Sequence, residues 1–141
     1  MQSGDAESAS VAGTIVLAED DSDLRAVYAR CLRQAGHVVW EAEDGAQALA
    51  LVRARSPEVL LLDIWMPILN GLEVLERLAS TPEAVGLKVV VFSRQNDADT
   101  RLEGFALGVV DYWTKDMSIV DLCDRMERIM RSTSKAYNPP D

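Results

Sequence analysis

The sequence of 141 residues predicts an α/β fold built on one parallel β-sheet. Three observations support this prediction. Short apolar segments of strand length alternate with longer segments in which apolar residues recur at helical spacing. Three of the apolar segments are nearly continuous in Val, Ile and Leu, which is typical of strands buried on both faces. The chain is also long enough for one domain with its own hydrophobic core.

Five segments are predicted as strands because they are short, apolar and bounded by polar or turn-forming residues. They cover residues 14–18, 37–41, 59–62, 88–92 and 109–112. Helical patterns fill the intervals between most of them, so successive strands are expected to run parallel, with helices on both faces of the sheet.

Five helices are predicted. The first begins after a cap at Asp21 or Ser22 and ends before Gly36. Its apolar stripe consists of Leu24, Val27, Tyr28, Cys31 and Leu32. The last begins after a cap at Ser118 and has the clearest stripe, formed by Ile119, Leu122, Cys123, Met126, Ile129 and Met130. Weaker patterns predict helices at 46–55, 71–80 and 99–107.

The composition excludes several classes of function. With 14 basic and 23 acidic residues the net charge is −9, which argues against direct binding of nucleic acid, since that requires clustered Lys and Arg. Residues 1–13 contain neither a basic residue nor an apolar run, so a secretory signal is excluded. The apolar segments are too short to cross a bilayer, and we expect a cytoplasmic protein without membrane contact.

Two further expectations concern the ends of the chain and its two cysteines. Residues 1–12 and 133–141 are predicted to be disordered tails around a domain at 13–132. Cys31 and Cys123 fall at apolar helical positions, and we expect buried, reduced thiols rather than a redox pair.

Polar residues follow four of the predicted strands. They are Glu19, Asp20 and Asp21 after the first, Asp63 after the third, Ser93 after the fourth and Lys115 beyond the fifth. The carboxyl ends of parallel strands share one edge of the sheet, so these side chains should converge there. Clustered carboxylates repel one another unless a cation lies between them, and oxygen ligands at an open site suit Mg²⁺.

This set of groups is suited to accepting a phosphoryl group. Asp63 would attack phosphorus, the metal and Lys115 would neutralise the oxygens, and Ser93 would donate a hydrogen bond to one of them. Each residue alone has an ordinary explanation, such as a helix cap for Asp20 or Asp21 and a solvated surface position for Lys115. The combination of one such residue at each strand end favours the functional interpretation.

The chain resembles the receiver domain of bacterial two-component response regulators. The resemblance covers residues 13–132 and depends on four stretches and one glycine. These are Ile15-Val-Leu-Ala-Glu-Asp-Asp-Ser-Asp-Leu-Arg25, Leu61-Leu-Asp-Ile-Trp-Met-Pro67 with Gly71, Val90-Val-Phe-Ser93, and Asp111-Tyr-Trp-Thr-Lys115. It implies a flavodoxin-like, doubly wound sheet of five parallel strands in the order 2-1-3-4-5, flanked by five helices.

The resemblance also implies a role for each site residue. Asp63 is the phosphorylated aspartate, and Ser93 and Lys115 contact the phosphoryl group. Glu19 and Asp20 form the acidic pair of a Mg²⁺ site, with Mn²⁺ as an alternative ion, and the Asp63 carboxylate and the backbone carbonyl of Trp65 complete it. Tyr112 occupies the aromatic switch position, where it would fill the space that Ser93 vacates on phosphorylation.

The function implied is that of a phosphorylation-activated signalling switch rather than a turnover enzyme. A sensor histidine kinase or a phosphotransfer protein would donate the phosphoryl group. The surface formed by residues 99–107, 109–112 and the last helix would then change for a protein partner or for an output domain outside this chain. A homodimer through this surface is left open.

Three departures from the family pattern bear on the site. Asp116 stands where proline is usual, so we expect a trans peptide or a rearranged loop, in which Asp116 would compete for the Lys115 ammonium. Arg94 and Trp65 are bulky, and we predict that they lengthen the phosphorylated lifetime. Arg94 would do so by covering the acceptor; alternatively, it would pair with Asp97 or Asp99 on the outside.

The same residues bear on two other classes of function. A scaffold that signals without phosphorylation remains an alternative because of these departures. An aspartate-nucleophile phosphatase needs a second carboxylate two residues after the nucleophile, and Trp65 stands at that position, so this class is excluded.

Overall fold

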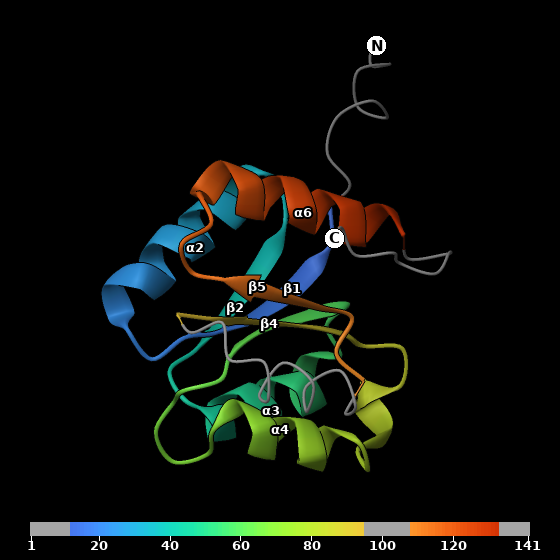
Figure 1. Cartoon of the computed structure of the whole chain (residues 1–141). Helices are drawn as coiled ribbons and strands as arrows, with labels where there is room; N and C mark the ends of the chain where they lie inside the picture. Colours follow the sequence, from blue (N-terminus) through green and yellow to red (C-terminus); the bar gives the residue numbers. More distant parts are fainter. Residues whose placement is uncertain (1–11, 95–107, 133–141) are drawn as a thin grey trace.

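The computed structural model describes residues 12–94 and 108–132, and a parallel sheet organises both ranges (Figure 1). The strands are β1 (Thr14–Ala18), β2 (Val38–Ala42), β3 (Val59–Asp63), β4 (Lys88–Ser93) and β5 (Asp111–Thr114). Their order is β2-β1-β3-β4-β5, and every pairing is parallel, which confirms the predicted topology. The central strand β3 is buried along its whole length, as its continuous apolar sequence predicts.

Helices cover both faces of this sheet. The helices α2 (Ser22–Gln34) and α6 (Ile119–Arg131) lie on one face, and α3 (Gly45–Arg55) and α4 (Gly71–Leu78) lie on the other (Figure 1). A short 3₁₀ helix, η1 (Pro82–Ala84), precedes β4. Each face has its own core of buried residues. The helix predicted at 99–107 and the two predicted tails lie outside the described residues, except for residue 12.

The helix ends follow the local sequence. The Asp21 side chain caps α2 by accepting from the backbone N–H groups of Asp23 and Leu24, and the Ser118 side chain caps α6. Asn70 and Glu73 form a reciprocal capping box at the start of α4. These caps fix where the helices begin relative to the loops that follow the strands.

The structure corrects three details of the predicted elements. The last strand lies at Asp111–Thr114, two residues later than expected, after a turn at Gly108, whose φ is +97°. The second strand begins at Val38, because the buried His37 lies between the turn at residues 35–36 and the strand. Val27 is largely exposed, so the buried stripe of α2 consists of Tyr28, Ala29 and Leu32.

The expectation of two reduced thiols was wrong. Cys31 on α2 and Cys123 on α6 are joined by a disulfide, with their Cα atoms 7.0 Å apart. Both positions are half-buried rather than fully buried. Amphipathic spacing predicted the helices correctly but carried no information on which residues of two distant helices would meet.

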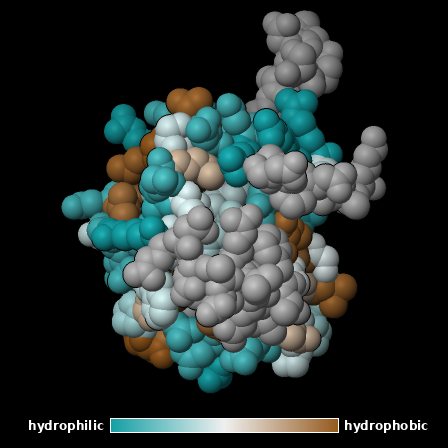
Figure 2. Space-filling view, in the orientation of Figure 1, coloured by the Kyte–Doolittle hydropathy of each residue, from teal (hydrophilic) through white to brown (hydrophobic). Residues whose placement is uncertain are grey.

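The described residues on the face shown in Figure 2 are mainly polar. On the face shown in Figure 2, hydrophobic residues appear as separate small groups among hydrophilic ones. Within 12–94 and 108–132, no helix combines the length and the apolar character that crossing a bilayer requires.

Candidate functional site

The carboxyl ends of four strands bring the predicted site residues to one edge of the sheet. Glu19 directly follows β1, Asp63 ends β3, Ser93 ends β4, and Lys115 directly follows β5. Because β1, β3, β4 and β5 are neighbours in the sheet, these four positions lie in consecutive places along one edge.

Lys115 links two of the carboxylates. Its Nζ donates to Oε1 of Glu19 at 2.5 Å and to Oδ2 of Asp63 at 3.1 Å. All three side chains are almost completely buried, with exposed fractions of 7% for Lys115, 1% for Glu19 and 5% for Asp63. The ammonium also lies 5.0 Å from the centroid of the Phe92 ring, within the range of a cation–π interaction.

The backbone around Glu19 holds its carboxylate in place. The Glu19 N–H donates to the carbonyl of Ala42 at 3.1 Å, and the Asp21 N–H donates to Oε2 of Glu19 at 3.0 Å. Arg25, one turn into α2, donates from Nη1 to the Glu19 carbonyl at 2.7 Å. The start of α2 therefore fixes the backbone of Glu19, and Lys115 and Asp21 fix its two carboxylate oxygens.

The loop after β3 approaches Asp63 closely. The Trp65 N–H donates to Oδ1 of Asp63 at 3.3 Å, and the Gly71 N–H donates to the carbonyl of Ile64 at 2.8 Å. A Cβ at Gly71 would lie 2.7 Å from the Asp63 carbonyl oxygen, so only glycine allows the start of α4 to pack this tightly. Ile68 in the same loop has a φ of +70°, an unfavourable conformation for a β-branched residue.

The electrostatics of the cluster favour neutralisation of its carboxyl groups. Burial raises the pKa of Glu19, although its hydrogen bond from Lys115 opposes the shift. Burial raises the pKa of Asp63 in the same way, and the positive charge of Lys115 opposes it. Burial lowers the pKa of Lys115, but its hydrogen bonds and charge interactions with Glu19 and Asp63 outweigh this effect and raise it. One ammonium thus only partly compensates the buried carboxylates.

The donor set fits a hard divalent cation. Glu19, Asp20 and Asp63 each offer a carboxylate oxygen, and these oxygens lie within 4.8 Å of one another. They border a cavity of about 310 Å³ that is also lined by Asp21, Trp65, Arg94 and Lys115. An open cavity with oxygen ligands and room for water suits Mg²⁺ better than an enclosed site would.

Ser93 and Tyr112 are both buried and lie on the neighbouring strands β4 and β5. Ser93 is fully buried, and its carbonyl accepts from the Lys115 N–H at 2.8 Å. Tyr112 is buried in the core on the α3 and α4 face, where it pairs with Val91, two residues before Ser93. The structure therefore holds the Tyr112 ring inside the molecule.

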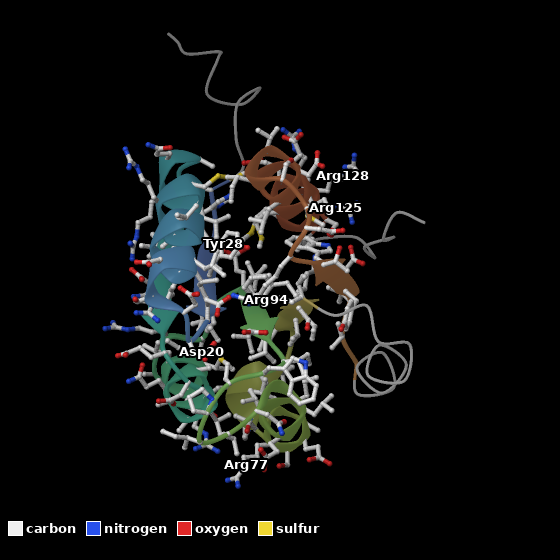
Figure 3. The ribbon with its side chains drawn as sticks, turned by 60° about the vertical axis from the view of Figure 1, so that its left-hand side comes forward. Asp20, Tyr28, Arg77, Arg94, Arg125 and Arg128 are labelled. Carbon is white, nitrogen blue, oxygen red and sulfur yellow. A yellow bond between two sulfur atoms is a disulfide. The ribbon has the colours of Figure 1, made fainter. Side chains whose placement is uncertain are left out.

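Arg94 and Trp65 border the mouth of the cavity. Arg94 extends from the end of β4 toward the start of α2, where Asp20 lies, and its Nη2 is 3.7 Å from Oδ2 of Asp21 (Figure 3). The residues considered as alternative partners, Asp97 and Asp99, lie outside the described residues. Trp65 is 55% exposed.

Asp116 does not rearrange the contacts of Lys115. Its Oδ1 accepts a hydrogen bond from the hydroxyl of Thr114, while Lys115 binds Glu19 and Asp63. The peptide bonds among the described residues are all trans, as expected without proline at this position.

Two contacts of the site were missed by the sequence analysis. The ion pair between Arg94 and Asp21 crosses from β4 to α2, and the hydrogen bond from Arg25 holds the carbonyl of Glu19. The spacing of Arg25 from the acidic pair, slightly more than one helical turn, was an available signal. Nothing in the sequence indicates the direction in which Arg94 extends.

Comparison with known proteins gives one consistent result. The family model described as the response regulator receiver domain matches residues 15–127. The chain is 31% identical over 123 residues to the phosphate regulon transcriptional regulatory protein PhoB of Pseudomonas aeruginosa, covering 87% of this chain and 54% of PhoB. It is 34% identical over 119 residues to the response regulator MprA of Mycobacterium ulcerans, covering 84% of this chain and 50% of MprA. The chain thus spans about half the length of these curated relatives.

Solved structures show the same similarity. The receiver domain of the Francisella response regulator 1452 superposes with a TM-score of 0.78 at 26% identity, covering 86% of this chain and 98% of that domain. The signal receiver domain of the putative response regulator NarL from Mycobacterium tuberculosis gives a TM-score of 0.75 at 25% identity, covering 84% of this chain and 96% of that domain.

Proposed function

The chain belongs to the response regulator receiver domain family, and from this premise we propose that it is a phosphorylation-activated switch with Asp63 as the phosphoacceptor. One observation carries this proposal. The buried Asp63 carboxylate shares the Lys115 ammonium with Glu19 at the edge of an open acidic cavity. A structural ion pair would need neither the second carboxylate nor a cavity large enough for a phosphoryl group.

The residues around Asp63 supply the parts of a phosphoryl transfer. A carboxylate oxygen of Asp63 attacks phosphorus, and the bond from phosphorus to the histidine nitrogen of the donor breaks. Lys115 is already placed between Asp63 and Glu19, so it neutralises the transferred oxygens without a large rearrangement. The Ser93 hydroxyl donates a hydrogen bond to one of these oxygens.

A divalent cation fits the same cavity. Glu19, Asp20 and Asp63 would hold Mg²⁺, or Mn²⁺ in its place, through their carboxylates, and the backbone carbonyl of Trp65 would complete the protein ligands. When bound, the cation supplies positive charge next to the phosphoryl oxygens. Arg25 and the Asp21 N–H orient Glu19 for this role from outside the ligand set.

Phosphorylation would then change the surface near β5 and α6. The Ser93 hydroxyl moves toward the phosphoryl group, and the ring of Tyr112 shifts into the vacated space. The altered surface comprises residues 99–107, β5 and α6, and it would contact an output partner or an output domain outside this chain. The donor would be a sensor histidine kinase or a phosphotransfer protein in the cytoplasm, and catalysis is limited to the chain's own phosphorylation and dephosphorylation.

Intact mass measurement after incubation with acetyl phosphate tests this proposal. We expect one phosphoryl adduct in the parent with Mg²⁺ and none after chelation of the metal. Asp63→Asn should form no adduct, and Asp124→Asn, which removes an exposed carboxylate on α6, should behave as the parent. An adduct on Asp63→Asn would show that another residue is the acceptor. Failure of the parent both to form an adduct and to bind beryllofluoride would favour the scaffold hypothesis instead.

The bulky residues at the cavity mouth provide a finer proposal. Arg94 is held by Asp21, and Trp65 lies at the same cavity, so both restrict access of water to phosphorylated Asp63. We expect Arg94→Ala to lose the phosphoryl group about tenfold faster, which corresponds to about 1.4 kcal/mol in the barrier. The adduct half-life by mass spectrometry measures this, with the equally charged Arg94→Lys as control. An unchanged half-life in Arg94→Ala contradicts a role for Arg94.

A further inference from the structure

The two cysteines of the chain lie on neighbouring helices of one face of the sheet. Cys31 belongs to α2 and Cys123 to α6, and the disulfide between them spans 92 residues of sequence. The two helices run side by side over this face (Figures 1 and 3). Since these 141 residues contain no other cysteine, this is the one disulfide that can form within a single chain of this sequence.

The disulfide joins the two helices close to the site. Helix α2 begins directly after the acidic residues that follow β1, and α6 begins at Ile119, four residues after Lys115. The sulfur of Cys31 lies 4.0 Å from the carbonyl oxygen of Ile119. The bond therefore connects α2 to the first turns of α6, at the end of α6 nearest the site.

A second cavity lies between α2 and the segment that precedes α6. It has a volume of about 390 Å³ and is lined by Leu24 and Tyr28 of α2, and by Lys115 and Asp116 before α6. Arg94 borders both this cavity and the acidic one. Cys31 follows Tyr28 by one helical turn, so a covalent link at Cys31 limits how far the two walls of this cavity can separate.

Cys31 and Cys123 are both half-buried, which leaves the disulfide within reach of a small thiol. A disulfide that was only structural would be expected in a protein of an oxidising compartment. In a cytoplasmic protein, as proposed above, thiols are kept largely reduced, and disulfides there are usually transient and redox-sensing.

We propose that Cys31 and Cys123 form a reversible redox site whose disulfide fixes α6 against α2 and whose reduction allows α6 to move. The effect on signalling rests on the proposed function, because α6 belongs to the surface that phosphorylation is to change. The oxidant is a small-molecule disulfide such as oxidised glutathione. One cysteine thiolate attacks it and releases one glutathione, and the second thiolate attacks the mixed disulfide and releases the other.

Counting thiols tests the covalent part of this proposal. The protein is equilibrated with oxidised or reduced glutathione, treated with iodoacetamide under denaturing conditions and weighed. We expect no alkyl group on the oxidised protein and one on each of its two cysteines after reduction. Two alkylated cysteines after oxidation overturn the proposal, as does a disulfide that joins two chains instead of residues of one chain.

Amide hydrogen exchange tests the effect on α6. In the parent without phosphate, exchange in the first turns of α6 should be about tenfold slower in the oxidised than in the reduced form. Cys31→Ser and Cys123→Ser should exchange like the reduced parent under both conditions, which controls for direct effects of the oxidant. Equal exchange in the two forms of the parent overturns the proposal, whatever the phosphorylation result.

Addition of acetyl phosphate and Mg²⁺ to the same samples separates the two proposals. A phosphoryl adduct on Asp63 together with a smaller change in α6 exchange in the oxidised form supports both. If the adduct forms but the change in α6 exchange is equal in the oxidised and the reduced protein, the regulatory effect is overturned. The assignment of Asp63 as the phosphoacceptor then still stands. A redox effect on α6 without any adduct and without beryllofluoride binding contradicts the proposed function and restricts the redox site to control of α6 alone.

Discussion

The two ends of the sheet both bury ionisable side chains, but they hold them in opposite ways. At the carboxyl end, Glu19 and Asp63 share the Lys115 ammonium beside a cavity of about 310 Å³. At the amino end, Nδ1 of His37 accepts from the Gly13 N–H at 3.1 Å, and Nε2 faces Oε1 of Glu127 at 3.7 Å. The first arrangement keeps charge inside the protein, and the second keeps an imidazole neutral.

This difference separates function from stability. Burying charge costs free energy unless partners and hydrogen bonds compensate it. At the carboxyl end burial raises the pKa of Glu19 and Asp63 despite their contacts with Lys115, so the compensation there is incomplete. A divalent cation, bound alone or together with a phosphoryl group, would neutralise that excess of negative charge. At the amino end burial lowers the pKa of His37, so the uncharged ring acts as a packing residue with one backbone hydrogen bond.

The largest effect is expected from removing the ammonium group of Lys115, which the two buried carboxylates at the carboxyl end of the sheet share. Lys115→Met leaves two buried carboxylates facing each other without their shared partner. We expect the rate of phosphorylation by acetyl phosphate to fall about 10²-fold or more. The free energy of unfolding at neutral pH should fall by about 3 kcal/mol, measured by urea denaturation.

A lysine at the amino end provides the matched control. The Nζ of Lys88 donates to the carbonyl of Ile129 at 3.3 Å and to the hydroxyl of Ser132 at 3.0 Å. Lys88 is the first residue of β4, so it lies at the opposite end of the strand from the acidic cavity. Lys88→Met should cost about 1 kcal/mol of stability and leave the phosphorylation rate unchanged. If both variants phosphorylated equally fast, Lys115 would have no role in the transfer.

The next largest difference between the two ends of the sheet is expected when Gly71 or Gly13 is replaced by alanine. A Cβ at Gly71 would meet backbone atoms of Asp63 and Ile64 at 2.7 and 2.8 Å, whereas a Cβ at Gly13 would meet mainly the flexible end of Met130. We expect Gly71→Ala to lose about 1–3 kcal/mol of stability and to slow phosphorylation, because the loop after Asp63 must shift.

Gly13→Ala is the control for that prediction. Its nearest neighbours are Sδ and Cε of Met130, which can rotate away, so its cost should stay below about 1 kcal/mol, with normal phosphorylation. Urea denaturation and adduct formation are measured on both variants. Equal losses would mean that side-chain flexibility at the amino end does not absorb the added methyl group.

The sequence predicted most of the framework because local signals sufficed. Apolar composition located β1 and β3, and the caps at Asp21 and Ser118 located the starts of α2 and α6. The sequence pattern placed β5 two residues too early, because the apolar pair Val109-Val110 before it resembles the start of a strand. The true register is decided by the pairing of β5 with β4. Register depends on a neighbouring strand and cannot be obtained from one segment.

The site was predictable as a set of positions but not as a set of contacts. The rule that sites form at the carboxyl ends of parallel strands was enough to bring Glu19, Asp63 and Lys115 together. The pairing of Arg94 with Asp21 and the disulfide depend on long side chains and on the spacing of two helices. Both follow from tertiary packing, which leaves no periodic signal in the sequence.

The smallest expected effect is that of pH, and it should act in opposite directions at the two ends. Burial lowers the pKa of His37 below its ordinary 6.5, so the unfolded chain binds this proton more readily than the native state. The free energy of unfolding should therefore fall as the pH drops below about 6.5. Burial raises the pKa of Asp63 above 3.8, so the native state binds that proton first, and the cost of this buried carboxylate shrinks as the pH falls.

Two variants separate these contributions in urea midpoints measured across a pH series. His37→Gln keeps an acceptor for the Gly13 N–H and cannot be protonated, so it should lose less stability in acid than the parent. Glu127 and Glu58 favour the charged imidazole and reduce the difference. Asp63→Asn should be more stable than the parent at neutral pH and should lack the parent's compensating gain in acid. If His37→Gln lost stability as steeply as the parent below pH 6.5, the neutral imidazole would not be the group through which acid acts.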